Sequence, residues 1–430
     1  MFLDLFGQEC KKISKNILYY ALIIIMILFY ATQYATDSSE DISLMIREPR
    51  ESDADYGYRY AEIPEQVMSE LAGNLYREYS NNNYPSYPFG FIKYVKLNAN
   101  KQVRAAEIFY EITGYTIEEY NDFLVVEYNK QKEEFKEEFE EEFGEMILDG
   151  YTVSTPIAET MTYERFKELM GQMSEMVGVG SSYSNFERYG KEELTYENAI
   201  KEHENLVEKD KVSGAYARNF SDYMGIVLGL FPAFLVVSFS LKDKRAKMEE
   251  LIYLRKASSL AIVGSRMLAQ TIMVFLPLLI LGLISTIEIF LVAKTMSYGI
   301  DLLAFVKYSF AWLLPTLMFT IGLSYLITEL AENAIAILVQ VVVWFYNISG
   351  TLLYGDYGLS LMIRHNIFGG YEIYKAGFNE IVGNRIFYGM LSLILFFITT
   401  FVYSQKRKGK SYVKRKPIKV FADSSKKSVA

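Results

Sequence analysis

Six long apolar stretches constrain this chain more than any other feature of its sequence. A hydrocarbon core of about 30 Å requires roughly 20 apolar residues in a helix. Each stretch comes close to that length, so the sequence predicts six transmembrane helices with kinks at the prolines inside them. The stretches lie near Ile17 to Tyr34, Tyr223 to Leu241, Leu260 to Ile284, Leu302 to Ile327, Ala334 to Leu353 and Ile386 to Tyr403, and the prolines are Pro232, Pro277 and Pro315.

Charge separates the chain into two kinds of segment. Residues 37–219 contain 38 acidic and 19 basic side chains, whereas the rest of the chain contains 14 acidic and 25 basic ones. The long acidic segment follows the first apolar stretch, which lacks a cleavage site and is expected to be retained as an anchor. The sequence therefore predicts one soluble domain, residues 37–219, inserted between transmembrane helices 1 and 2.

The basic residues also predict the orientation of the chain. They gather before the first apolar stretch, after the second and after the sixth, and such clusters face the cytoplasm. We therefore expect a multi-pass protein of the cell membrane with both termini cytoplasmic and residues 37–219 extracytoplasmic. The short segment Thr328 to Asn333 does not fit this orientation, because it should be cytoplasmic and yet contains Glu329 and Glu332.

The acidic domain has a mainly helical pattern. The stretches around Phe89 to Leu97 and Gly150 to Pro156 are candidates for short strands, so the predicted fold is mainly α with minor β. Candidate helices lie near Pro64 to Asn81, Thr116 to Asp149, Tyr163 to Val177 and Glu192 to Arg218. Within the second of these, Phe135, Phe139 and Phe143 share one face, which either packs inside the domain or forms part of a docking surface for cationic peptides.

Catalytic and cofactor motifs are missing from the sequence. The chain contains two histidines and one cysteine, Cys10, and neither a metalloprotease nor a nucleophile-elbow pattern occurs. The tripeptide Gly409-Lys410-Ser411 lacks the earlier glycine of a phosphate-binding loop. We expect no enzyme activity and no cofactor or metal in this chain. The basic tail, residues 405–430, is expected to bind membrane lipids rather than nucleic acid.

A family resemblance joins these features. An amphipathic start (FLDLFGQECKKISKN), one span, a large outer insertion and five further spans resemble the permease subunit of type-2 ATP-binding-cassette exporters, most specifically in MEELIYLRKASSLAIVGSRML, Met248 to Leu268. The resemblance implies four parts. They are 1–36 with the N-terminal interfacial helix and transmembrane helix 1, 37–219 as the outer domain, 220–404 with helices 2–6, and the tail 405–430.

The loop 242–259 resembles the family's coupling segment, a short helix that sits in a groove of the cytosolic ATPase. The resemblance implies that ATP and magnesium are bound by that separate ATPase, and that a second permease copy or a paralogue completes the transporter. Lys256-Ala257 departs from the family, which often has a proline there. The residues expected to couple to the ATPase are Lys244, Glu249, Glu250, Leu251 and Arg255.

The segment Tyr354 to Arg385 resembles the family's extracellular re-entrant region. Its glycine-rich part is a candidate exit gate, because irregular backbone at membrane depth must be surrounded by protein or water. Two charged residues of the long third span mark either a polar pathway or side chains that reach toward the two interfaces. The predicted gate and pathway residues are Arg266, Glu288, Arg364, Gly369 and Gly370.

The sequence thus favours the permease subunit of an exporter for antimicrobial peptides, drugs or lipids. The acidic outer domain favours cationic peptides among these, because a negative potential concentrates positive ligands. The alternative is a non-transporting membrane receptor or assembly platform whose outer domain binds a partner.

Overall fold

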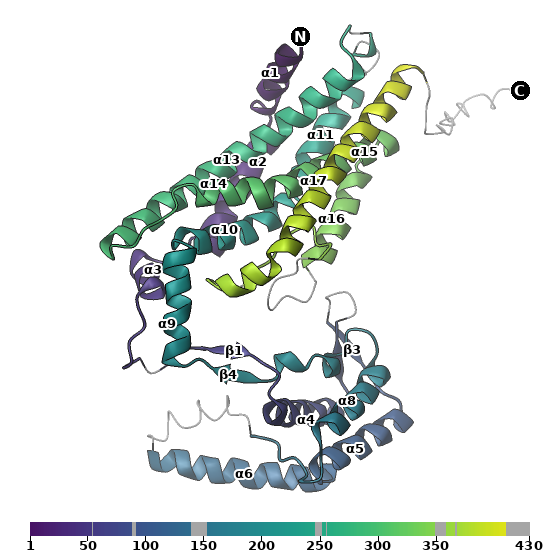
Figure 1. Ribbon diagram of the computed structural model, residues 1–430. Helices are drawn as coiled ribbons and strands as arrows, with labels where there is room; N and C mark the ends of the chain where they lie inside the picture. The colour runs from purple at the N-terminus through teal and green to yellow at the C-terminus, as the bar shows by residue number, and fades with distance from the viewer. Residues whose placement is uncertain are drawn as a thin grey trace, which may run out of the picture. The chain divides into compact units, whose positions relative to one another are not determined.

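The computed structural model describes residues 1–53, 55–87, 92–138, 153–245, 252–254, 256–348, 358–365 and 368–409, and the fold is mainly helical (Figure 1). The chain divides into two compact units. We call Met1–Glu48 with Glu202–Ala430 the bundle, and Pro49–Lys201 the inserted domain. The inserted domain is shorter at both ends than the predicted soluble domain, residues 37–219.

Five helices within the described part of the bundle are long and apolar enough to cross a membrane, as a multi-pass membrane protein requires. They confirm five of the six predicted spans. The other, α16 (Ile335–Ile348), is apolar but has 14 residues, and the end of its predicted span lies outside the described residues, so a sixth span stays a prediction. The five helices are Ile17–Tyr34, Ser213–Lys242, Ser259–Thr295, Ala304–Ala331 and Tyr371–Arg407.

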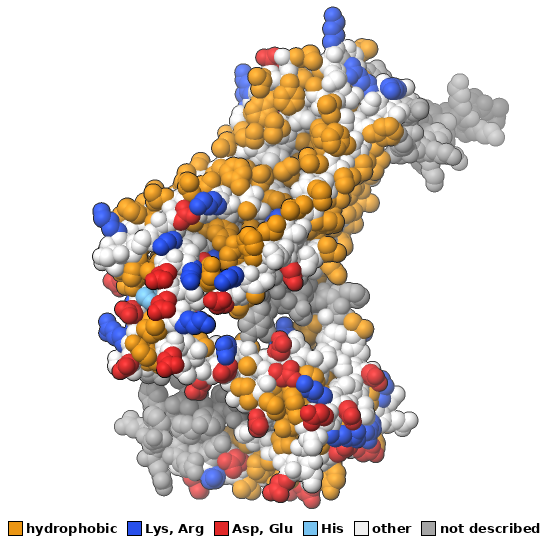
Figure 2. Space-filling view, viewed as in Figure 1, with side chains coloured by type: hydrophobic (Ala, Val, Ile, Leu, Met, Phe, Trp, Pro, Cys, Tyr) orange, Lys and Arg blue, Asp and Glu red, His pale blue; other side chains and the backbone are white. Residues whose placement is uncertain are grey.

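The bundle is assembled around its long helices, with α15 packed against α17 and α11, and α1 packed along α13. Hydrophobic side chains cover much of the visible face of this bundle (Figure 2). The elements of the bundle are α1 (Phe2–Ile13), α2 (Ile17–Phe29), α3 (Ser39–Ile46), α10 (Ser213–Leu228), α11 (Pro232–Arg245), α13 (Ser259–Thr295), α14 (Ala304–Tyr308), α15 (Leu314–Ala331), α16 and α17 (Tyr371–Arg407), and α9 (Tyr196–Glu204) leads from the inserted domain into it.

The prolines of the apolar stretches act in different ways. Pro232 begins α11, so the second span is broken between Leu228 and Pro232. Pro315 lies in the first turn of α15 and follows a π-helical turn, Ser309–Leu313. Proline lacks an amide hydrogen. Both prolines lie at the start of a helix, where the backbone N–H has no partner within the helix and its loss is tolerated. Pro277 alone lies within a continuous helix, α13.

The inserted domain has a helical core flanked by two small antiparallel sheets. Leu71, Phe109, Phe166 and Met170 are fully buried in this core. Strand β1 (Tyr58–Tyr60) pairs with β4 (Lys191–Glu193), and β2 (Tyr84–Ser86) pairs with β3 (Lys93–Val95). The helices are α4 (Pro64–Ser80), α5 (Ala99–Thr113), α6 (Ile117–Glu138) and α8 (Tyr163–Val177).

Helices α4 and α8 lie where the sequence predicted them, and β3 lies inside a predicted strand region. The prediction of one helix over residues 192–218 is wrong, because α9 ends at Glu204 and α10 begins only at Ser213. Helix α5 was not predicted. Phe139 and Phe143 of the predicted phenylalanine stripe lie outside the described residues, as does the Phe135 side chain.

One acidic side chain, the partly buried Glu78, contacts the core of the inserted domain. The Tyr183 hydroxyl donates a hydrogen bond of 2.5 Å to Oε2 of Glu78, and Tyr183 is fully buried. Burial raises the pKa of the Glu78 carboxyl to about 7, and the hydrogen bond from Tyr183 opposes that rise only in part. This carboxyl therefore titrates near neutral pH.

Candidate functional site

The segment 358–365 is non-helical, and it is exposed at Gly358 and Leu359 but largely buried in the bundle from Ser360 onward. Leu361 and Met362 are fully buried, and His365 is 1% exposed. Non-helical backbone has no internal hydrogen-bond ladder, so each buried carbonyl and amide needs a partner from elsewhere. The side chains that supply these partners identify the candidate site.

Arg385 of α17 is the principal donor to this segment. Its Nη2 donates to the carbonyl oxygen atoms of Leu361 at 3.0 Å and Ser360 at 3.2 Å. Its Nη1 donates to the carbonyl of Trp312 at 2.8 Å and to Oγ1 of Thr316 at 2.9 Å. Arg385 thus joins α17, the end of the π-helical turn, α15 and the buried segment.

Two asparagines complete the backbone pairing. Asn384 donates through Nδ2 to the carbonyls of Gly358, at 2.7 Å, and Ser360, at 2.8 Å. Asn347 of α16 accepts the backbone N–H of Leu361 through Oδ1 at 2.5 Å. The amide group suits this role because it carries both donors and an acceptor without a charge.

Asp222 of α10 holds the end of the segment. Its Oδ2 accepts the backbone N–H of His365 at 2.8 Å, and its Oδ1 forms an ion pair with Nε of Arg364. Asp222 is 3% exposed. Burial of a carboxylate is tolerated only with such charge-assisted partners.

A second buried ion pair joins Arg218 of the same helix to Asp210, which lies just before that helix. The Arg218 guanidinium donates to both carboxylate oxygens, at 2.6 and 2.5 Å, and to the carbonyl of Gly369 at 2.9 Å. The His365 ring contacts the same carbonyl at 3.3 Å. Gly369, Arg364 and His365 therefore belong to one network with two acids and Arg218.

The turn that places Asp210 is strained. Lys211 and Val212 have φ values of 51° and 54°, and the N–H of Ser213 donates to the carbonyl of Lys211 in a γ-turn. A β-branched residue at positive φ costs on the order of 1–3 kcal/mol and persists only when its surroundings enforce it. Ser213 supplies part of that support, because its hydroxyl bonds to both backbone groups of Asp301.

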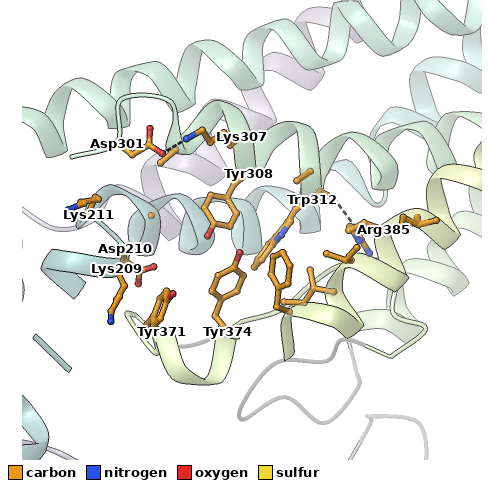
Figure 3. A pocket seen from close by; sticks show the side chains of 17 residues that line it. Lys209, Asp210, Lys211, Asp301, Lys307, Tyr308, Trp312, Tyr371, Tyr374 and Arg385 are labelled. Carbon is orange, nitrogen blue, oxygen red and sulfur yellow. Dashed lines mark hydrogen bonds and ion pairs between the residues drawn. The ribbon is translucent and has the colours of Figure 1, made fainter. Parts of the chain in front are cut away.

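A cavity of about 630 Å³ adjoins this network (Figure 3), and we call it the Trp312 cavity. Trp312, Tyr308 and Tyr374 form its aromatic wall, and Arg385 lies at one end. The ring centroids of Tyr308 and Trp312 are 5.3 Å apart. The residue that holds the buried segment thus also lines the cavity, so a ligand in the cavity would lie beside that segment.

The other end of α17 carries a different charge cluster. Lys406 pairs with Glu332 at 2.8 Å and with Glu329 at 3.6 Å. These are the two acids that did not fit the predicted orientation, and Lys406 compensates their negative charge. Arg407 next to it donates to the carbonyls of Tyr253 at 2.7 Å and Ala257 at 2.6 Å, inside the loop 242–259.

The predicted coupling residues are mostly beyond what the structure describes. Lys244 lies in the last turn of α11, and its side chain is outside the described residues. Glu249, Glu250, Leu251 and Arg255 lie outside them altogether. Their role stays a prediction.

The predicted gate and pathway residues separate into two groups. Arg364 and Gly369 join the network described above, and Gly370, with φ of 56°, forms the N-cap of α17. Arg266 instead lies 3.8 Å from Glu9 of α1, and Glu288 is half-buried on α13. The structure does not bring these two residues into the network around residues 358–365.

Several network residues were missed from the sequence. Arg218 had been placed in the outer domain, and Arg385 at the end of a loop. A usable signal existed, because ionisable or amide side chains inside apolar stretches are costly and usually paired. Asn347 in the fifth predicted span fits that description, and Asp222 lies one residue before the second.

Comparison of this chain with protein-family models, with curated proteins and with solved structures gave no match.

Proposed function

We propose that this chain is the permease subunit of an ATP-driven exporter. In this proposal the chain spans the cell membrane six times, with both termini in the cytoplasm and the inserted domain outside. The five apolar helices support the membrane part of the proposal. The arrangement of spans and the segment Met248 to Leu268 support the rest through their resemblance to type-2 exporters.

The observation that carries the proposal is the buried non-helical segment, residues 358–365. Anchoring a domain needs only apolar helices, whereas this bundle keeps two ion pairs and Arg385 among its buried residues. Polar groups at membrane depth are expensive and accompany pathways and moving parts. We assign the segment the role of a gate beside the Trp312 cavity.

We place the contact with the ATPase near the opposite end of α17. The loop 242–259 would contact a separate cytosolic ATPase, which binds ATP and magnesium, through Lys244, Glu249, Glu250, Leu251 and Arg255. The hydrogen bonds from Arg407 to Tyr253 and Ala257 link the loop to α17. Nucleotide that favours one of two conformations of the bundle would shift the population through this link.

A second permease copy or a paralogue would complete the path, with membrane lipids around it. The substrates proposed are antimicrobial peptides, drugs or lipids, and cationic peptides suit the excess of acidic residues in the segment 37–219.

A receptor or assembly platform is the second candidate function. The inserted domain favours it, because this unit has its own hydrophobic core and could bind a partner without any transport. In that case the ATPase is not needed.

Affinity purification of the full chain from cell membranes in mild detergent tests the proposal. We expect a Walker-motif ATPase to co-purify, and we expect Glu249→Lys with Glu250→Lys to reduce its recovery at least tenfold and to abolish export or resistance in cells. The matched control is Glu192→Lys with Glu193→Lys on the exposed strand β4, which makes the same charge change.

Recovery of no ATPase with the native chain, together with unchanged export in the loop variant, would overturn the exporter. Recovery of another protein that is lost on changes to the inserted domain, again without an ATPase, would favour the receptor.

A further inference from the structure

The Trp312 cavity has an unequal distribution of charge. Four basic residues and two acidic residues line it. Both acids already have a cation: Asp210 binds Arg218, and Asp301 lies 2.5 Å from Nζ of Lys307. Within the described part of the chain, Lys209 and Lys211 have no carboxylate within 4.0 Å, and Arg385 contacts only neutral oxygen atoms and an aromatic ring. The wall therefore carries an excess of positive charge.

The positive groups are separated by the aromatic wall. In Figure 3, Lys209 and Lys211 lie toward one end of the cavity and Arg385 lies toward the other, with Tyr308 and Tyr374 between them. The donors of Arg385 are already used by Trp312, Thr316, Asn384 and the buried segment. The lysine end is therefore where an anionic group would be bound directly.

Apolar side chains of α17 continue the cavity onto the surface of the bundle. Phe378, Val382 and Ile386 line the cavity and are 46%, 38% and 55% exposed. They recur at the spacing of one helix face. On a helix that crosses a membrane, such a face contacts lipid chains.

We propose that the Trp312 cavity binds an anionic lipid, with its headgroup between Lys209, Lys211 and Lys307 and its acyl chain along Phe378, Val382 and Ile386. Tyrosine and tryptophan suit the level of the headgroups, because their rings have both apolar and polar edges. The site does not require that the chain transports anything.

The aromatic rings alone could indicate a zwitterionic choline lipid, whose quaternary ammonium group binds to aromatic faces. The structure argues against that ligand. The Arg218 guanidinium carbon lies 4.5 Å from the centroid of the Tyr374 ring and 6.0 Å from that of Tyr308. Rings that already face a cation, beside two further lysines, would repel a second positive group.

Tryptophan fluorescence tests the proposal directly, because the chain has only two tryptophans, Trp312 and Trp344. Trp344→Phe leaves Trp312 in the cavity wall as the single reporter. The full-length variant is reconstituted in phosphatidylcholine vesicles in which roughly one lipid in ten to twenty has brominated acyl chains. We expect brominated phosphatidylglycerol to quench Trp312 about threefold more than brominated phosphatidylcholine at the same mole fraction, which corresponds to a preference of roughly 0.7 kcal/mol.

The test variant adds Lys209→Gln and Lys211→Gln, which should remove that preference. Lys201→Gln with Lys294→Gln is the matched control, because both lysines are exposed and neither lines the cavity. Equal quenching by the two lipids, or a preference that survives in the Lys209 and Lys211 variant, would overturn the proposal.

Discussion

The two ends of α17 hold their buried cations in opposite ways. Near one end, Arg385 donates to neutral oxygen atoms, including the carbonyls of Trp312 and Leu361. Near the other end, Lys406 is paired with the carboxylates of Glu329 and Glu332. The first arrangement uses a charge to hold irregular backbone in place, and the second neutralises charges where helices end.

This difference teaches what each cation stabilises. Loss of Arg385 would remove its charged hydrogen bonds to the carbonyls of Ser360 and Leu361, which keep only the neutral donors Asn384 and Thr316. A hydrogen bond to a charged group contributes roughly 1.5–3 kcal/mol. Loss of Lys406 would leave two acids, of which the Glu332 side chain is 24% exposed and can be hydrated. The larger effect is therefore expected at the Arg385 end.

Arg385→Met should have the largest effect. We expect a loss of about 3–5 kcal/mol in the free energy of unfolding, because the carbonyls of Trp312, Ser360 and Leu361 each lose a hydrogen bond from a charged donor. Thermal unfolding of the purified full chain in detergent measures it. Arg385→Lys, which keeps the charge and some donors, should lose less. If the methionine variant is as stable as the native chain, the segment 358–365 is not held by Arg385.

Lys406→Met should have a smaller effect, about 2–3 kcal/mol in the same measurement, because Glu332 can reach water although Glu329 stays buried. Addition of Glu329→Gln and Glu332→Gln to this variant should restore most of the lost stability. An equal loss for Lys406→Met and Arg385→Met would remove the contrast between the two ends of α17.

The smallest expected effect is a pH dependence of stability that arises from Glu78 of the inserted domain. Its pKa of about 7 in the folded chain lies above that of an exposed glutamate, about 4.3, so folding favours its protonated form. Its stabilising contribution is therefore complete below about pH 4.3 and is lost as the pH rises through 7. After allowance for partial solvent access, the change is roughly 1 kcal/mol.

Hydrogen exchange of the α4 amides in the full chain, corrected for intrinsic exchange rates, measures this change. Protection should fall between about pH 4.3 and 7 in the native chain and level off above the pKa of Glu78, about 7. Glu78→Gln should abolish that fall, and Glu70→Gln, a second glutamate of α4 outside the core, is the control. Protection with the same pH dependence in Glu78→Gln would show that another group titrates.

The apolar pattern of the sequence was sufficient for the long helices. Ile17–Tyr34 agrees with its predicted bounds, and the helices that begin at Ser259 and Ala304 start within two residues of prediction. The helix that begins at Ser213 starts ten residues before its predicted span. Hydropathy detects the apolar middle of a helix and not its polar continuation. For that reason it missed the first fifteen residues of α17, from Tyr371 to Arg385.

The candidate site was predicted only in part. The glycine-rich composition indicated Gly369, and the charge indicated Arg364. Composition could not reveal that Asp210 and Arg218 meet, because their contact depends on the strained turn at Lys211 and Val212. The partners of residues 358–365 come from the flanking helices α16 and α17, 14 to 26 residues away, and from Asp222 of α10, and a hydropathy pattern does not record such pairing.

The continuity of α17 has a mechanical consequence. The helix contains no proline, and Arg385 and Arg407 are separated by about 33 Å along its axis at 1.5 Å per residue. Both arginines donate to backbone carbonyl oxygens outside α17, one in the segment 358–365 and one in the loop 242–259. A continuous helix that is attached near both ends moves as one rigid body. A tilt about its middle that moves Tyr253 in one direction must carry Leu361 in the other, or else break a hydrogen bond at one of the two arginines.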